Sequence, residues 1–336
     1  MSHPKKVLVT CATGNQGRGV VQHCLAAGHQ VCAYVRDPTM PTATQLAQWG
    51  ATLVPGNLDD LEALRTAMHG VDAVFLTEVQ TGDCEGDLQR SSNVILAAQE
   101  AAATVTHVIV STAIKTGQHA SFPGWGKPDS HGGGEDEDDA AARAHPMRQY
   151  WLNKHTLETR VRAAAAASSS SDGFIRHWTI VRPGHYLQNL LPPVNALTFP
   201  GFEQDRILRV AWWPQTQLPW VDAGDVGIVV AVAITDPERY SHRAIDLAVE
   251  ALTVEQLAGK LDRALSKGGV PVSVEYRSEE EVDEMIRLGN PVAAAQQWAN
   301  QVPGGDAVGN CRDDLGTLVQ ACTSVDAFLA ANASRL

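Results

Sequence analysis

The sequence predicts an α/β fold: a doubly wound parallel sheet with helices on both faces, joined to a smaller C-terminal lobe. Three observations support this class. The first 115 residues alternate short β-branched runs with amphipathic stretches of helical length. A glycine-containing segment, residues 10–19, directly follows the first β-branched run. The chain has 336 residues, which is enough for a large α/β unit with an appended lobe.

Strands and helices are expected to alternate in the first part of the chain. The strands are placed at residues 6–10, 30–36, 51–55, 73–76 and 107–111. The helices between them are placed at residues 16–27, 43–49, 61–69 and 87–102. Gly28 and Gly70 stand just past two of these helices, where glycine commonly ends a helix.

The later part of the chain has a less regular pattern. Residues 116–146 hold glycines, prolines and the acidic run 135–139, which predicts a solvated, flexible insertion. A long helix from about residue 146 to 167, a serine connector at 168–171 and a sixth strand at 175–182 are expected next. Further helices are expected near residues 225–234, 254–265, 279–288 and 324–331. We therefore expect a nucleotide-binding domain over residues 1–190 and a substrate lobe over 191–336, with residues 222–248 returning to the sheet.

Composition restricts the classes of partner. The chain has 38 acidic and 26 basic side chains, a net charge of −12, which argues against nucleic acid or an anionic membrane as a direct partner. Its six cysteines form no C-x-x-C pair and show no zinc-ligand spacing, so we expect reduced thiols, a cytoplasmic location and no metal. The longest apolar stretch, residues 226–234, is about half the ~20 residues needed to cross a bilayer.

The glycine segment has the context of a dinucleotide-binding loop of the Rossmann type. A strand, a glycine turn and a helix follow one another, so the backbone can approach a pyrophosphate at the N-terminus of the helix. The residues expected to contact the cofactor here are Thr10, Cys11, Thr13, Gly14, Asn15, Gln16 and Gly17.

The end of the second strand indicates which dinucleotide is bound. Arg36 stands 19 residues after Gly17, and a guanidinium there suits the 2′-phosphate of NADP(H). The alternative is that Asp37 contacts the ribose of NAD and Arg36 is an exposed charge. We expect NADP(H).

Several motifs together resemble the NmrA-like family of atypical short-chain dehydrogenases. Residues 9–17, Val-Thr-Cys-Ala-Thr-Gly-Asn-Gln-Gly, are similar to that family's opening V-T-G-A-T-G-N-Q-G. Further similar segments are residues 56–60, 110–112, 178–189 and 220–227, so the resemblance covers residues 5 to about 250. Cys11 replaces the first glycine of the loop, which predicts strain if that residue has a positive φ. Asn57 replaces the usual acid near the adenine.

Tyr150 and Lys154 form a Y-x-x-x-K pair on the helix that follows the fifth strand. In the short-chain dehydrogenases that this resembles, the lysine holds the nicotinamide ribose and lowers the pKa of the tyrosine, which donates a proton to the substrate. Ser111 or Thr112, at the end of the fifth strand, is the candidate third member of the set. The alternatives are that Tyr150 is a packed aromatic beside Trp151 and that the strand-end hydroxyl is a satisfied turn residue.

Other residues are assigned to the two ligands, those along the cofactor through the same resemblance and those along the substrate through their aromatic rings. Along the cofactor we expect Asn57, Leu58, Thr77, Pro183, His185 and Tyr186. Along the substrate we expect Tyr186, Trp212 and Trp213, whose rings suit a bulky apolar or heteroaromatic molecule. Simple core packing of these aromatic residues is the alternative.

The expected function is an NADP(H)-dependent oxidoreductase that transfers hydride to or from a C=O, C=C or C=N carbon of a hydrophobic small molecule such as a secondary metabolite. One alternative is a non-catalytic NADP(H) sensor that binds a protein partner according to the cofactor's redox state. Another is an NADP(H)-bound enzyme that guides a redox-neutral cyclisation or isomerisation.

Overall fold

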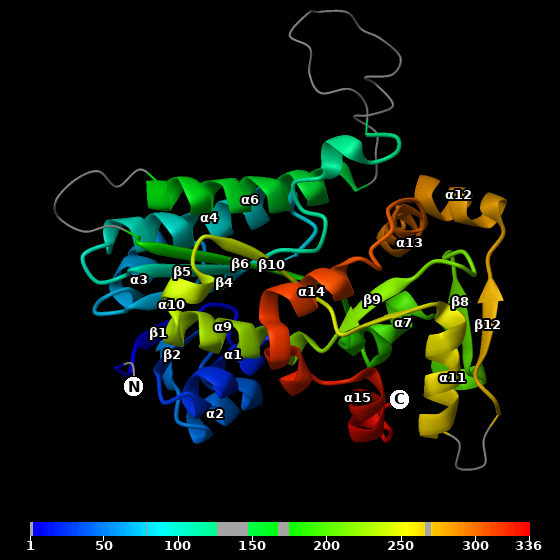
Figure 1. Ribbon diagram of the computed structural model, residues 1–336, viewed down its shortest axis with the longest axis horizontal. Coiled ribbons are helices and arrows are strands. Elements are labelled where there is room, and N and C mark those ends of the chain that lie inside the picture. The colour runs from blue at the N-terminus through cyan, green and yellow to red at the C-terminus, as the bar shows by residue number, and fades with distance from the viewer. Residues whose placement is uncertain (1–2, 79, 126–146, 167–174, 266–269) are drawn as a thin grey trace, which may run out of the picture. The chain divides into compact units, whose positions relative to one another are not determined.

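Residues 3–78, 80–125, 147–166, 175–265 and 270–336 are described by a computed structural model of the chain (Figure 1). They divide into two units. The first comprises residues 1–113, 153–183 and 223–245, and the second comprises 114–152, 184–222 and 246–336. The second unit thus includes residues 114–152 and 184–190, which lie before the boundary expected at residue 190.

In the first unit, strands alternate with helices. Helix α6 (Arg148–Ala166) begins in the second unit and continues into the first, whereas strand β10 (Arg243–Leu247) begins in the first and ends in the second. The other strands of the first unit are β1 (Lys6–Val9), β2 (Gln30–Val35), β3 (Thr52–Pro55), β4 (Ala73–Thr77), β5 (His107–Ser111) and β6 (His177–Pro183). Its other helices are α1 (Asn15–Ala26), α2 (Pro41–Gln48), α3 (Leu61–Ala67), α4 (Cys84–Glu100), η3 (Ala223–Asp225), α9 (Val226–Thr235) and α10 (Pro237–Tyr240).

The seven strands form one sheet with the order β10-β6-β5-β4-β1-β2-β3. Strands β1 to β6 pair in parallel, with Val7 opposite Val31 of β2 and opposite Ala73 of β4. Chain order reverses between β1 and β4, so the carboxyl ends of these two strands border the crevice where such sheets bind ligands. The predicted doubly wound parallel sheet is confirmed.

Helices cover both faces of this sheet. Figure 1 shows α3, α4 and α6 on one face and α1, α2 and α9 on the other. Helices α1 and α9 pack closely because both carry glycine at their contact. A Cβ atom at Gly227 would lie 2.2 Å from the carbonyl oxygen of Gly19, and one at Gly19 would lie 2.3 Å from that of Gly224. Larger side chains would separate the helices.

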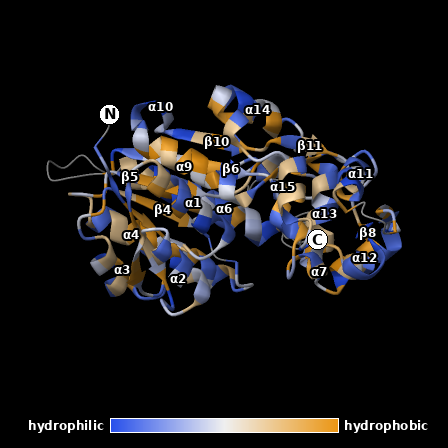
Figure 2. Ribbon diagram, turned by 90° about the horizontal axis from the view of Figure 1, so that it is seen from below, coloured by the Kyte–Doolittle hydropathy of each residue, from blue (hydrophilic) through white to orange (hydrophobic). Residues whose placement is uncertain are grey.

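Apolar side chains from neighbouring strands form the core of the first unit. Leu8, Val74, Val110 and Ile180 come from β1, β4, β5 and β6 and are fully buried, packed with Leu157 of α6. Helix α9 is hydrophobic along its length, as Figure 2 shows, because it is buried on nearly every side. No helix in the described ranges is long and apolar enough to cross a membrane.

The second unit contains short strands and many helices. Strands β7 (His185–Tyr186), β9 (Leu218–Val221) and β11 (Glu250–Leu252) form a sheet of order β11-β9-β7, and β8 (Ile207–Val210) pairs in parallel with β12 (Ser273–Tyr276). Its helices are η1 (His119–Ser121), η2 (Leu187–Leu190), α7 (Asn195–Thr198), α8 (Phe202–Asp205), α11 (Val254–Leu265), α12 (Glu279–Arg287), α13 (Pro291–Gln301), α14 (Ala307–Leu315), η4 (Gly316–Ala321) and α15 (Val325–Asn332).

Helices α2 and α4 begin two and three residues earlier than the sequence pattern predicted, each for a local reason. Helix α2 begins at Pro41 rather than residue 43, because proline fits the first helical position. Helix α4 begins at Cys84 rather than residue 87, because the Asp83 carboxylate caps it by accepting the Gly86 amide N–H at 3.0 Å. Gly28 and Gly70 follow α1 and α3 with φ of 84° and 67°, as the predicted helix ends require.

The start of the acidic segment differs from the expected solvated insertion. Phe122 and Trp125 are 5% and 6% exposed, and the Phe122 ring packs against Trp151 and Trp298 with centroids 5.3 and 5.4 Å apart. Apolar burial therefore anchors residues 119–125 in the second unit. The rest of the expected insertion, residues 126–146, and the serine connector at 168–171 lie outside the described residues.

Candidate functional site

The glycine loop joins the end of β1 to the start of α1. Thr10 is buried and its hydroxyl donates to the Phe75 carbonyl at 3.0 Å, which fixes the loop to β4. Gly14 is the N-cap residue of α1, and no side chain caps the helix. The first amide N–H groups of α1 therefore remain available to an anion.

Gly17 and Cys11 determine the shape of this loop. A Cβ atom at Gly17 would lie 2.2 Å from the Cys11 carbonyl oxygen, so only glycine fits. Cys11 itself has φ of 49°, the left-handed conformation that the family's first glycine would adopt without strain. Burial raises the pKa of the Cys11 thiol to about 11, although the nearby Arg36 charge acts in the opposite direction. The thiol is therefore protonated at neutral pH.

Arg36 and Asp37 were the two candidates for reading the ribose, and Arg18 is a third charged side chain, at the start of α1. Asp37 accepts hydrogen bonds from the amide and hydroxyl of Thr39 at 2.8 and 2.6 Å, which lower the pKa of its carboxyl. Arg18 donates to Gln45 at 3.0 Å and lies over the Trp49 ring. Arg36 is exposed just after β2 and has no hydrogen bond or ion pair to any described residue. Of the three, Arg36 has the guanidinium that is available to a phosphate.

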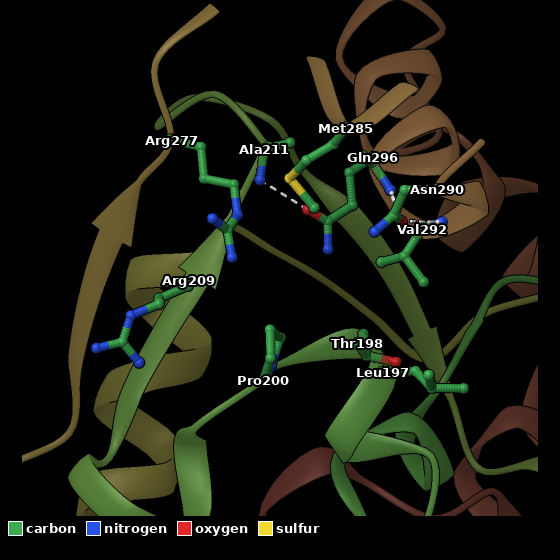
Figure 3. Close-up of a pocket in the computed structure, with 11 residues that line it drawn as sticks. Leu197, Thr198, Pro200, Arg209, Ala211, Arg277, Met285, Asn290, Val292 and Gln296 are labelled. Carbon is green, nitrogen blue, oxygen red and sulfur yellow. Dashed lines mark hydrogen bonds between the residues drawn. The ribbon is translucent and has the colours of Figure 1, made fainter. Parts of the chain in front are cut away.

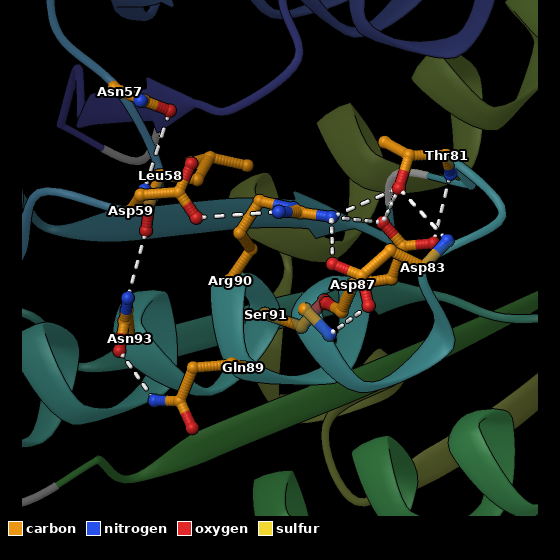
Figure 4. Close-up of polar contacts among 11 residues, drawn as sticks. Asn57, Leu58, Asp59, Thr81, Asp83, Asp87, Gln89, Arg90, Ser91 and Asn93 are labelled. Carbon is orange, nitrogen blue, oxygen red and sulfur yellow. Dashed lines mark hydrogen bonds and ion pairs between the residues drawn. The ribbon is translucent and has the colours of Figure 1, made fainter.

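Asn57 and Leu58 lie in the turn after β3, which polar contacts hold in place (Figure 4). The Tyr34 hydroxyl donates to the Asn57 carbonyl at 3.0 Å, and the Asn93 amide donates to the Leu58 carbonyl at 2.9 Å. The Asn57 side-chain oxygen accepts the Asp59 amide N–H at 3.3 Å. The backbone of this turn is therefore fixed before any ligand arrives.

Buried polar groups gather at the carboxyl ends of β4 and β5. Thr77 ends β4 and accepts a hydrogen bond from the Gln16 side-chain amide at 3.2 Å. Glu78 follows it and forms an ion pair with Lys154 at 2.8 Å, with the two side chains only 3% and 5% exposed. Ser111 ends β5 and is 1% exposed. Pairing of Thr77 with Ser111 across β4 and β5 places these groups at one edge.

Three polar atoms at this edge are buried without a hydrogen-bond partner among the described residues: Gln16 Oε1, Glu78 Oε1 and Ser111 Oγ. Such atoms cost about 1–3 kcal/mol each when unsatisfied. A dinucleotide fits here, because its phosphates suit the start of α1 and its ribose hydroxyls and carboxamide can bond these atoms.

Thr112, the alternative to Ser111, belongs to a different network. Its hydroxyl donates to Glu158 at 2.8 Å, and Arg182 binds the same carboxylate through two nitrogens at 2.8 and 2.6 Å. Arg162 adds a further bond at 2.9 Å. Both oxygens of the fully buried Glu158 are thus occupied, and the network fixes α6 against β5 and β6.

Tyr150 and Lys154 stand one turn apart on α6, as the Y-x-x-x-K spacing predicted. Tyr150 belongs to the second unit and packs edge-to-face against Trp151, with ring centroids 4.9 Å apart. Lys154 belongs to the first unit and meets Glu78. The lysine thus has a buried counter-charge that the sequence did not predict.

The remaining residues predicted to contact the cofactor or the substrate lie in both units and differ in burial. Pro183 ends β6 in the first unit, and His185 and Tyr186 form β7 in the second. The His185 ring lies 6.0 Å from Trp212 and 5.7 Å from Trp220, and burial lowers the pKa of His185 to about 4. His185 is therefore neutral at pH 7. Trp212 is 4% exposed and Trp213 is 43% exposed, so the structure does not bury the two indoles together.

The sequence profile of the NmrA-like family matches residues 3–125 and 134–333, nearly the whole chain. The chain belongs to the NmrA-like family. It is 26% identical over 291 residues to an NAD(P)H azoreductase of Xenophilus azovorans, covering 86% of this chain and 83% of that protein. It is 25% identical over 304 residues to the nitrogen metabolite repression protein NmrA of Emericella nidulans, covering 84% and 75%. The family thus includes a reductase and a regulator.

The fold of this NmrA-like chain also agrees with solved structures. The crystal structure of NmrA, a negative transcriptional regulator, in complex with NADP superposes with a TM-score of 0.70 at 21% identity, covering 98% of this chain and 95% of that one. This likeness confirms the fold. The cofactor in that crystal is the one predicted from the sequence of this chain.

Glu78 is the site residue that sequence reasoning missed. Its signal is an acid directly after the fully buried β4, at the strand end that borders the crevice. No group of three or more metal-ligating side chains occurs within the described part of this NmrA-like chain.

Proposed function

We propose that this protein is an NADP(H)-dependent reductase of a hydrophobic small molecule. The observation that carries the proposal is the set of three buried, unpartnered polar atoms beside the glycine loop, on Gln16, Glu78 and Ser111. A ligand with hydroxyl and amide groups would satisfy them. The azoreductase among the relatives supports the reductase assignment.

Each part of the first unit would hold one part of the cofactor. The backbone from Gly14 to Gly17 would bind the pyrophosphate, and Arg36 would bind the 2′-phosphate through charge-assisted hydrogen bonds. The turn at Asn57 and Leu58 would lie along the adenine. When bound, NADPH would supply hydride from C4 of its nicotinamide.

The buried polar groups at the carboxyl ends of β4 and β5 would position the reacting groups. Glu78 orients the Lys154 ammonium, which would donate an N–H to a ribose hydroxyl. The Ser111 hydroxyl would donate to an oxygen or nitrogen of the substrate as negative charge develops there. Because these groups are preorganised and shielded from water, their interactions are stronger than on an exposed surface.

In the second unit we assign Tyr150 as the proton donor, and Tyr186 and Trp212 as residues that recognise an apolar substrate. His185 is neutral at pH 7, so it can donate its N–H in a hydrogen bond but cannot act as an imidazolium acid. Tyr150 therefore remains the better proton donor of the two.

A second candidate function is an NADP(H)-dependent regulator without turnover, and one observation favours it. Glu78 places a negative charge 2.8 Å from the Lys154 ammonium. This carboxylate offsets the positive charge that Lys154 brings to the site, which weakens the part that the lysine could take in proton transfer. The regulator NmrA among the relatives supports the same alternative.

Isotope transfer distinguishes the two functions. The protein is incubated with NADPH deuterated at C4, each stereoisomer in turn, together with a metabolite extract, and products are searched by mass spectrometry for one added deuterium. The reductase proposal predicts a labelled product from one stereoisomer only, and a Tyr150→Phe variant should lose the label while NADPH affinity is unchanged. NADPH binding without any labelled product would contradict the reductase and favour the regulator.

A further inference from the structure

The second unit contains a small, partly open pocket with a cavity volume of about 40 Å³ that is unrelated to the predicted cofactor residues. It is bordered by α7, β8, the segment after β12, α12 and the start of α13 (Figure 3). Much of its wall is apolar, with side chains that include Leu197, Pro200, Met285 and Val292. This volume is well below that of enclosed small-molecule sites, so a ligand held here would extend partly into solvent.

Gln296 directs an amide donor into this pocket. The side chain is 5% exposed, and its oxygen accepts the Ala211 amide N–H at 2.6 Å. This bond fixes the orientation of the amide, because a backbone N–H requires the oxygen. The side-chain NH₂ is therefore turned into the pocket, as Figure 3 shows, and it has no hydrogen-bond partner in the described part of the chain.

Two guanidinium groups line the same pocket, and they differ in their pairing. Arg209 is neutralised by Asp205 at 2.6 Å and by Glu275 at 3.5 Å. The half-buried Arg277 side chain forms no ion pair or hydrogen bond with any residue that the structure describes. Among the described residues, the pocket therefore has one positive charge without a counter-charge, beside the amide donor of Gln296.

We propose that this pocket binds a small monocarboxylate with an apolar body. Arg277 would bind the carboxylate through its planar fork, and the Gln296 NH₂ would donate to one carboxylate oxygen. Leu197, Met285 and Val292 would contact the apolar body. One uncompensated charge matches a monoanion better than a phosphate dianion. The proposal does not depend on the reductase activity.

Hexanoate tests this proposal by calorimetric titration of the full-length chain, with 1-hexanol and inorganic phosphate as comparison probes. Saturable hexanoate binding is expected, at least about tenfold tighter than that of 1-hexanol, because a charge-assisted hydrogen bond contributes about 1.5–3 kcal/mol. Phosphate binding without hexanoate binding would overturn the proposal, as would equal binding of hexanoate and 1-hexanol.

Substitutions locate the binding. Arg277→Gln should weaken hexanoate binding at least about tenfold. Gln296→Glu keeps the oxygen that accepts the Ala211 amide but places a negative charge in the pocket, so hexanoate binding should be lost. Arg287→Gln, on the solvent side of α12, is the matched control and should bind as the unmodified protein does. Hexanoate binding that survives both pocket substitutions would overturn the assignment.

Discussion

Helix α6 contributes to two buried ion pairs, one through Lys154 and one, a turn later, through Glu158. Both carboxylate oxygens of Glu158 are bonded, by Thr112, Arg182 and Arg162. The partner of Lys154, Glu78, has one oxygen with no partner among the described residues. The complete network holds the helix on the sheet, whereas the incomplete one can accept a ligand without disturbing the fold.

Adjacent residues at the end of β5 show the same contrast. Thr112 is bonded to Glu158, and the Ser111 hydroxyl is buried without a partner. Natural proteins satisfy most buried polar groups, so a cluster of exceptions points to a site that a ligand completes. Stability and ligand binding should therefore depend on different residues of one strand and one helix.

The largest expected effect is on stability. Glu158→Gln leaves Arg182 without its counter-charge in a mostly buried position, which should lower the free energy of unfolding by about 3–5 kcal/mol. The free energy of unfolding is measured by denaturation in urea. Glu62→Gln, at an exposed partner of Arg65, is the control and should change stability by less than about 1 kcal/mol. If Glu158→Gln also lowers the free energy of unfolding by less than about 1 kcal/mol, this network does not have the structural role proposed here.

The next effect is on cofactor affinity. Gly17→Ala places a Cβ atom against the Cys11 carbonyl, so the loop must move, and the dissociation constant for NADPH should rise at least about tenfold. Gly309→Ala is the matched control, because a Cβ atom there meets nothing within 4 Å. An unchanged NADPH affinity in Gly17→Ala would show that the loop does not form the binding surface.

The neighbouring pair at the end of β5 gives the smallest and most specific effect. Thr112→Val removes a donor to buried Glu158 and should lower the free energy of unfolding by about 1–2 kcal/mol. Ser111→Ala removes a buried hydroxyl without a partner among the described residues, so the free energy of unfolding should stay the same or rise, while deuteride transfer falls. Equal destabilisation by the two substitutions would break the proposed contrast between the networks.

Much of the fold could be predicted because it depends on local patterns. Buried parallel strands appear as β-branched runs, and glycines past helix ends appear where φ must be positive, as at Gly28 and Gly70. Helix α13 was not predicted, although Asn290 and Pro291 give a capping residue followed by proline. Residues 119–125 were expected in solvent because burial of Phe122 depends on partners that are distant in sequence.

The glycine loop could be recognised from the sequence because its pattern is local. The contacts among the buried polar groups at the carboxyl ends of β4 and β5 could not. The pairing of Glu78 with Lys154 joins residues 76 positions apart, so no sequence spacing indicates it. The separation of Ser111 from Thr112 likewise depends on which side of β5 faces α6. Residue types at strand ends predicted that a site exists there, but tertiary contacts decide which groups remain unsatisfied.

Calorimetric titration of the unmodified protein and of Arg36→Ala with NADPH and NADH tests the central claim most directly. The account predicts one saturable NADPH site per chain, tighter for NADPH than for NADH. The preference should disappear in Arg36→Ala, through an NADPH affinity weakened by about tenfold or more and an unchanged NADH affinity. Absence of saturable binding by either dinucleotide would contradict the account.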